Sequence, residues 1–192
     1  LVDFIVTADG LVSMEIEPRE LIIDPFIPTF SLLMVYAERG RGKTWFALSL
    51  CVAICNGEKF LGHYDVPRPR TVLYIDGEMA LPDLQLRVSR IAKVPPPNFL
   101  LLPSERLFRE DRPLNINAAD DQQRINEALD QLVEQGRRPD LIVFDNLSSL
   151  SGGVDENDNS ALDALLGWLT GLRHKGYAVV LVHHAGKSGA QR

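Results

Sequence analysis

The chain has 192 residues, the usual size of one domain, and this length predicts a single hydrophobic core. Apolar residues make up 45% and charged residues 24%, a balance that excludes a disordered, collagen-like or disulfide-scaffold protein. Twenty basic against 26 acidic residues give a net charge of −6, so the chain lacks the general positive field of a self-sufficient nucleic-acid binder. Any contact with nucleic acid is therefore expected to be local or shared between subunits.

Two features of the sequence bear on the compartment. No apolar stretch reaches the roughly 18 to 20 residues that cross a bilayer, and no basic segment followed by an apolar one indicates a signal peptide. Cys51 and Cys55 lie one turn apart in an apolar helical run, which is typical of small buried thiols in a reducing compartment. We therefore expect a soluble, cytoplasmic protein with no membrane partner. Because the first residue is Leu1, we also expect a fragment of a longer protein.

Short apolar runs alternate with segments of helical period after an irregular lead-in over residues 1–30. This alternation predicts one α/β domain spanning 1–192, with its core in 31–192 and a mostly parallel central sheet flanked by helices. Segment 105–118 mixes charges with Pro113 and is expected to be a surface loop. The expected strands are 31–37, 71–76, 99–102, 141–145 and 178–184, and the expected helices are 43–55, 81–92, 119–135 and 160–174.

A phosphate-binding pattern connects the first expected strand to the first expected helix. In this strand–loop–helix setting, the glycines Gly40 and Gly42 let successive N–H groups turn inward towards a triphosphate at the helix N-terminus. Lys43 is expected to reach the β- and γ-phosphates and Thr44 to hold Mg²⁺ through its hydroxyl. The pattern departs at Ala37, where Gly is usual, and a chance match on a Gly-rich turn is the alternative. The predicted ATP-contacting residues are Ala37, Glu38, Arg39, Gly40, Arg41, Gly42, Lys43, Thr44 and Trp45.

Two other expected strands end in acids. Asp145 ends a buried apolar run and has the form of a Walker B aspartate, which orients the Mg²⁺ shell; a solubilising or helix-capping aspartate is the alternative. Asp76 and Glu78 follow another run and are separated by a glycine. We predict that Glu78 positions and polarises the attacking water, because it lies beyond the strand. Asp76 is expected to cap the following turn.

The last expected strand ends in the paired imidazoles His183 and His184. This position suits a sensor that donates a hydrogen bond only while the terminal phosphate is present. Side chains alternate along a strand, so at most one of the two is expected to face the nucleotide. His183 is favoured, and the alternative is that both merely end the strand and meet water.

Together these segments resemble the RecA-type AAA-family ATPases related to the plasmid RepA replicative helicase. The resemblance spans roughly residues 17–192 and implies a RecA-like P-loop core, ATP hydrolysis with Mg²⁺ and often a homo-hexameric ring that tracks single-stranded DNA. It assigns water activation to Glu78, metal coordination to Asp145 and phosphate sensing to the histidine pair. Family sequences continue into further strands, so the resemblance predicts an incomplete sheet. The segments that carry it are 37–44, 60–62, 72–79, 141–145, 152–157 and 181–188.

The resemblance also places two loops at the DNA channel of a ring. Loop 146–159 bears acids that oppose a phosphate backbone, whereas loop 185–192 carries Lys187 and Arg192 and suits single-stranded DNA. These two cations are equally candidates for acting on a neighbouring subunit's γ-phosphate. Two interpretations follow: an ATP-driven helicase of a plasmid, phage or integrated element, and an ATP-switched assembly or regulatory protein that does not unwind DNA.

Overall fold

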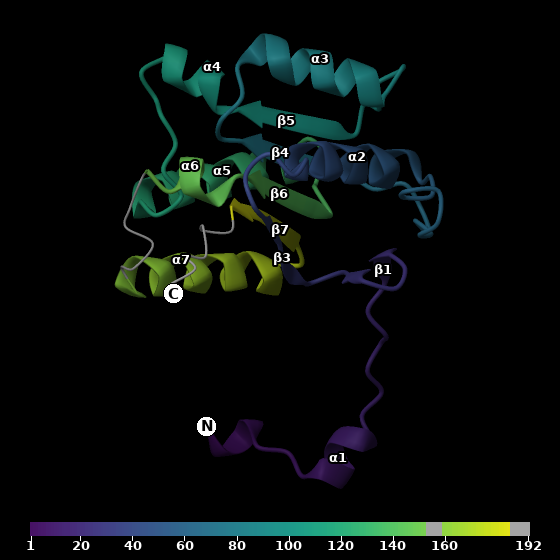
Figure 1. Cartoon of the computed structure of the whole chain (residues 1–192). Coiled ribbons are helices and arrows are strands. Elements are labelled where there is room, and N and C mark those ends of the chain that lie inside the picture. Colours follow the sequence, from purple (N-terminus) through teal and green to yellow (C-terminus); the bar gives the residue numbers. More distant parts are fainter. Residues whose placement is uncertain (153–158, 185–192) are drawn as a thin grey trace, which may run out of the picture.

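The computed structural model describes residues 1–152 and 159–184 of the chain. Its centre is a five-stranded sheet in the order β3-β7-β6-β4-β5, in which every neighbouring pair is parallel (Figure 1). This confirms the predicted RecA-like α/β fold. The strands are β3 (Leu32–Ala37), β4 (Val72–Asp76), β5 (Phe99–Pro103), β6 (Leu141–Asp145) and β7 (Ala178–His184).

Helices cover both faces of the sheet and divide the core into two clusters. One cluster packs α2 (Lys43–Asn56) and α3 (Leu81–Ile91) against one face. The other packs α5 (Ala119–Glu134), α6 (Leu147–Leu150) and α7 (Asn159–His174) against the opposite face. Strands β4 and β6 are buried at every position, because they lie inside the sheet and are covered on both faces.

Alternation along each strand decides which side chains face α2. On β4 and β6 the residues Val72, Tyr74, Leu141 and Val143 belong to the α2 cluster, and the intervening residues belong to the α7 cluster. Asp76 and Asp145 continue the first series, so both carboxylates fall on the α2 side of the sheet.

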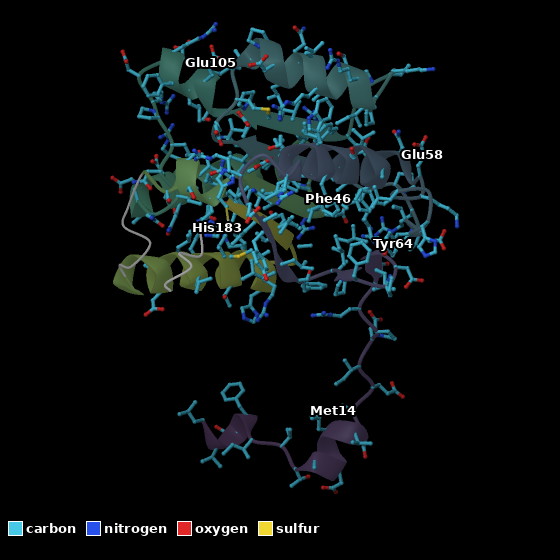
Figure 2. The ribbon with its side chains drawn as sticks, viewed as in Figure 1. Met14, Phe46, Glu58, Tyr64, Glu105 and His183 are labelled. Carbon is cyan, nitrogen blue, oxygen red and sulfur yellow. The ribbon has the colours of Figure 1, made fainter. Side chains whose placement is uncertain are left out.

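The sequence predicted an irregular lead-in over residues 1–30, but part of this segment is ordered into helices and strands. It forms η1 (Val2–Phe4), α1 (Ala8–Val12) and a hairpin of β1 (Leu21–Ile23) with β2 (Ile27–Pro28). Three isoleucines of the hairpin, Ile22, Ile23 and Ile27, are buried in the α2 cluster, which explains why the hairpin forms. By contrast, α1 lies apart from the sheet in Figure 1, and Figure 2 shows Met14 away from the packed side chains.

The expected loop 105–118 begins instead as a helix, α4 (Ser104–Arg109). Its Glu105 accepts hydrogen bonds from the Leu81 backbone N–H, at the start of α3, and from Arg109 one turn along α4. Ser104 Oγ also donates to the Asp76 carbonyl at 2.6 Å. These contacts attach α4 to the end of β4. Within the described ranges, no helix combines the length and apolarity needed to cross a bilayer.

Candidate nucleotide-binding site

A cavity of about 410 Å³ lies at the carboxyl edge of the sheet. Because all five strands are parallel, this edge collects the P-loop and the residues that follow β4, β6 and β7. The lining residues are Arg39, Gly40, Gly42, Lys43, Thr44, Trp45, Asp76, Glu78, Met79, Ala80, Asp83, Arg87, Asp145, Asn146 and His184.

The P-loop depends on two glycines in the left-handed region. Gly40 has φ 82° and Gly42 has φ 84°, and a Cβ on either would meet no atom within 4 Å. The requirement is therefore one of backbone conformation and not of space. Gly42 is the N-cap of α2, so the free N–H groups of that helix open towards the cavity.

Lys43 is held inside the loop. It is 7% exposed, and its Nζ donates to the carbonyl of Ala37 at 2.6 Å and to that of Glu38 at 2.9 Å. Ala37 and Glu38 therefore hold Lys43 in place through their backbone carbonyls, although neither residue lines the cavity. Arg41 is also outside the lining and pairs with the Glu38 carboxylate at 2.8 Å on the surface.

Asp145 is a buried carboxylate beside two hydroxyl groups. Tyr74 donates its phenolic O–H to Oδ2 at 2.5 Å, and the Thr44 hydroxyl is the second. Burial raises the pKa of Asp145, and the hydroxyls of Tyr74 and Thr44 act in the opposite direction. The contact with Thr44 brings together the two residues predicted to serve the metal.

Asp76 is the register partner of Asp145 on the adjacent strand, and it is 1% exposed. Burial raises its pKa to about 6, and the Asp145 charge adds to the increase. Its Oδ2 accepts the Met79 backbone N–H at 3.1 Å, which is the turn-capping arrangement expected from the sequence.

Glu78 extends beyond β4 and lies at the mouth of the cavity, with 55% of its side chain exposed. Its Oε2 accepts a hydrogen bond from Asn146 Nδ2 and lies 3.7 Å from His184 Nε2. Glu78, Asn146 and His184 thus come together from the ends of three different strands.

The structure brings His184, and not the favoured His183, to the cavity. Val182, two residues before His184, packs in the α2 cluster, whereas Leu181, two before His183, packs in the α7 cluster. Strand alternation therefore points His184 to the P-loop side. Among the described residues, neither ring nitrogen of His184 has a hydrogen-bond partner, although both are buried.

Arg87 of α3 lines the cavity although the sequence did not predict it. Its guanidinium lies 5.4 Å from the ring centroid of Trp45, which was predicted to contact ATP. Nothing local in the sequence of α3 marks Arg87, because the pairing depends on how α3 packs on α2. The predicted residues Lys187 and Arg192, and the acids Asp155, Glu156 and Asp158, lie outside the described residues.

A family model described as the AAA domain matches residues 2–190, nearly the whole chain. The chain belongs to the AAA domain family. The family match and the fold together identify the chain as a P-loop ATPase domain with a RecA-like fold. No curated protein matches the sequence.

A solved structure shares the fold of this AAA domain. The flagellar accessory protein FlaH from Methanocaldococcus jannaschii superposes with a TM-score of 0.53 at 16% sequence identity. The match covers 84% of this chain and 65% of the FlaH chain, so the AAA domain spans less than two thirds of that protein. At this identity the likeness shows the fold alone.

The oxygen donors of the AAA domain fit a magnesium ion. The Thr44 hydroxyl and the Asp145 carboxylate are hard oxygen donors, and both residues line the same cavity. The described part of the chain holds no cluster of three or more His, Cys, Asp or Glu residues arranged around one ion. Magnesium suits such a site, since it is usually bound by one or two protein ligands together with water and substrate phosphates.

Proposed function

We propose that this domain binds Mg-ATP at the cavity and hydrolyses it to ADP and phosphate. One observation carries the proposal: Lys43, Thr44, Asp145 and Glu78, which come from three separate segments, line the same cavity. Lys43 and the N-terminus of α2 supply positive charge where the triphosphate rests, and Thr44 with Asp145 supplies the metal ligands.

The reaction follows from these positions. Water attacks the γ-phosphorus, the bond from the γ-phosphorus to the bridging oxygen of ADP breaks, and Glu78 accepts the proton of the water. When bound, Mg²⁺ neutralises charge on the β- and γ-phosphate oxygens. Lys43 stabilises the same oxygens from the P-loop side. His184 is suited to donate a hydrogen bond to the γ-phosphate, because its ring faces the cavity with no partner among the described residues.

The decisive test compares two acids. Glu78→Gln keeps size and polarity but cannot accept a proton, so it is expected to bind ATP normally and hydrolyse it about 100-fold more slowly. Asp76→Asn is the matched control, because Asp76 caps a turn. If Asp76→Asn is crippled while Glu78→Gln turns over normally, the roles of the two acids are reversed.

We further propose that hydrolysis drives a homo-hexameric helicase or replication motor of a mobile element on single-stranded DNA. The resemblance to the RepA helicase group and the cations Lys187 and Arg192 in 185–192 support this proposal. DNA-stimulated ATPase and strand-displacement assays on the full-length protein test it. Stimulation without unwinding would favour an ATP-switched assembly factor.

The same cations provide a test of catalysis between subunits. A basic residue supplied in trans contributes about 10³-fold or more in related phosphoryl-transfer enzymes. Mixing Glu78→Gln subunits with Arg192→Ala subunits is expected to restore some turnover. Strict absence of rescue for both Arg192 and Lys187, in rings shown to mix, would rule out the role in trans.

A further inference from the structure

Asn146 follows Asp145 directly in the chain, but its side chain forms a hydrogen bond with Glu78. It is 2% exposed, and its Nδ2 donates to Glu78 Oε2. Its Oδ1 accepts the Ser149 backbone N–H at 2.9 Å and the Ser149 hydroxyl at 3.1 Å. One amide therefore joins Glu78 to the first turn of α6.

The chemistry of the partners determines which end of the amide faces Glu78. A backbone N–H can only donate, so the atom that faces Ser149 must be the amide oxygen. The –NH₂ group is then left for Glu78, whose carboxylate can only accept while ionised. A hydrogen bond to a charged acceptor is among the stronger ones. The Asn146 amide is also buried, so water competes little for this bond.

Close packing holds α6 in place behind this contact. Gly77 donates its N–H to the Asp145 carbonyl at 2.8 Å, which joins the ends of β4 and β6. A Cβ at Gly77 would lie 2.6 Å from Leu150 Cγ, so only glycine lets α6 approach this closely. At the other end of α6, the Leu150 carbonyl accepts the Ile116 N–H at 2.8 Å.

Among the residues that the structure describes, few contacts besides Asn146 restrain Glu78. More than half of its side chain is exposed, and His184 Nε2 is 3.7 Å away, beyond hydrogen-bond distance. A general base acts only when it is held within reach of the water it deprotonates, and a displacement of about 1 Å can reduce the rate about 100-fold.

We propose that Asn146 is a positioning residue that holds the Glu78 carboxylate in place for water activation and anchors it to α6. This inference rests on the proposed function, since it presupposes that Glu78 is the general base. Asn146 acts through Glu78 and does not itself touch the reacting atoms.

Two variants separate this role from support of the fold. Asn146→Asp keeps the shape and the oxygen that caps α6 but replaces the –NH₂ donor with an oxygen. Asn146→Ser also retains a good N-cap residue while being too short to reach Glu78. Each is expected to lower kcat for ATP hydrolysis about 10- to 100-fold, with KM unchanged within about 2-fold. Asn117→Ala is the matched control, because Asn117 bonds the Ser151 carbonyl just after α6, and its kcat is expected to stay within about 2-fold of the parent.

A double-mutant cycle decides whether the effect passes through Glu78. In the Glu78→Gln background, Asn146→Ser is expected to cause no further loss of kcat. The positioning role would be overturned if the kcat losses of the two single variants multiplied in the double variant. It would also be overturned if Asn146→Asp left kcat unchanged or raised it, or if only KM changed. A parent protein without ATPase activity, or a fully active Glu78→Gln variant, would instead overturn the proposed function and this inference with it.

Discussion

Asp76 and Asp145 are register partners at the ends of adjacent parallel strands, and both carboxylates are buried on the face that α2 covers. Asp145 accepts a hydrogen bond from the Tyr74 hydroxyl, whereas Asp76 accepts from the backbone at the start of the next turn. Two acids held side by side in the core are costly to ionise together. The site therefore carries electrostatic strain, which a bound cation would relieve.

The first prediction concerns stability and pH. The pKa of Asp76 is about 6 in the folded protein against an ordinary value of 3.8, so the folded state holds this proton more tightly than the unfolded state. The contribution of Asp76 to the free energy of unfolding therefore falls as pH rises from about 4 to about 6, and above pH 6 the full cost remains. Without nucleotide or divalent cations, Asp76→Asn is expected to be about 1 to 2 kcal/mol more stable than the parent at pH 8.

Thermal unfolding across pH checks this prediction. The advantage of Asp76→Asn is expected to shrink below about pH 6 and to vanish below about pH 3, where the parent carboxyl is protonated in both states. An advantage of the same size at every pH would show that the substitution acts by packing and not by charge.

The second prediction concerns Lys43. Lys43→Ala removes the buried cation that is proposed to contact the phosphates and also its bonds to the Ala37 and Glu38 carbonyls. We expect ATP affinity measured by calorimetry to fall at least about 10-fold, the effect of losing one charge-assisted contact. Lys59→Ala, at a surface lysine paired with Asp65, is the control. Equal affinity in Lys43→Ala and the parent would contradict the nucleotide site.

The third prediction concerns the hydroxyl that orients Asp145. Tyr74→Phe removes the 2.5 Å hydrogen bond and leaves a buried carboxylate with one hydroxyl partner fewer, so the pKa of Asp145 rises further. The Mg²⁺ concentration at half-maximal ATPase activity is expected to increase about 10-fold or more, as when an outer partner of a metal ligand is lost. Tyr36→Phe, at an exposed tyrosine of β3, controls for the loss of a hydroxyl elsewhere. An unchanged Mg²⁺ requirement would contradict the role of Asp145 as a metal ligand.

The fourth prediction distinguishes the two histidines. His184→Ala is expected to lower kcat about 10-fold or more, because it removes the cavity-lining ring that is proposed to donate to the γ-phosphate. His183→Ala is expected to stay within about 2-fold, because that side chain is on the α7 side. A stronger effect from His183→Ala would place the sensor on the other face of the sheet.

Local pattern predicted most of the fold. The strands Leu141–Asp145 and Ala178–His184 occur with the predicted bounds, because a buried parallel strand reads as a continuous apolar run between turn residues. The β1–β2 hairpin and α4 were not predicted. They form because Ile22 and Ile23 reach the α2 cluster and because Glu105 caps a helix 24 residues away in sequence, and neither contact has a local signature.

The sequence alone determined the chemistry available at the site: a P-loop with Lys43 and Thr44, and acids that end buried strands. Only the tertiary structure decided which of these groups meet. His184 lines the cavity and His183 does not, because the face of β7 is set by its partner helices and not by the histidine pair itself. Tyr74 and Asn146 join the site from positions that no spacing marks, since parallel strands bring residues distant in sequence to a single edge. Arg87 joins it because α3 packs on α2.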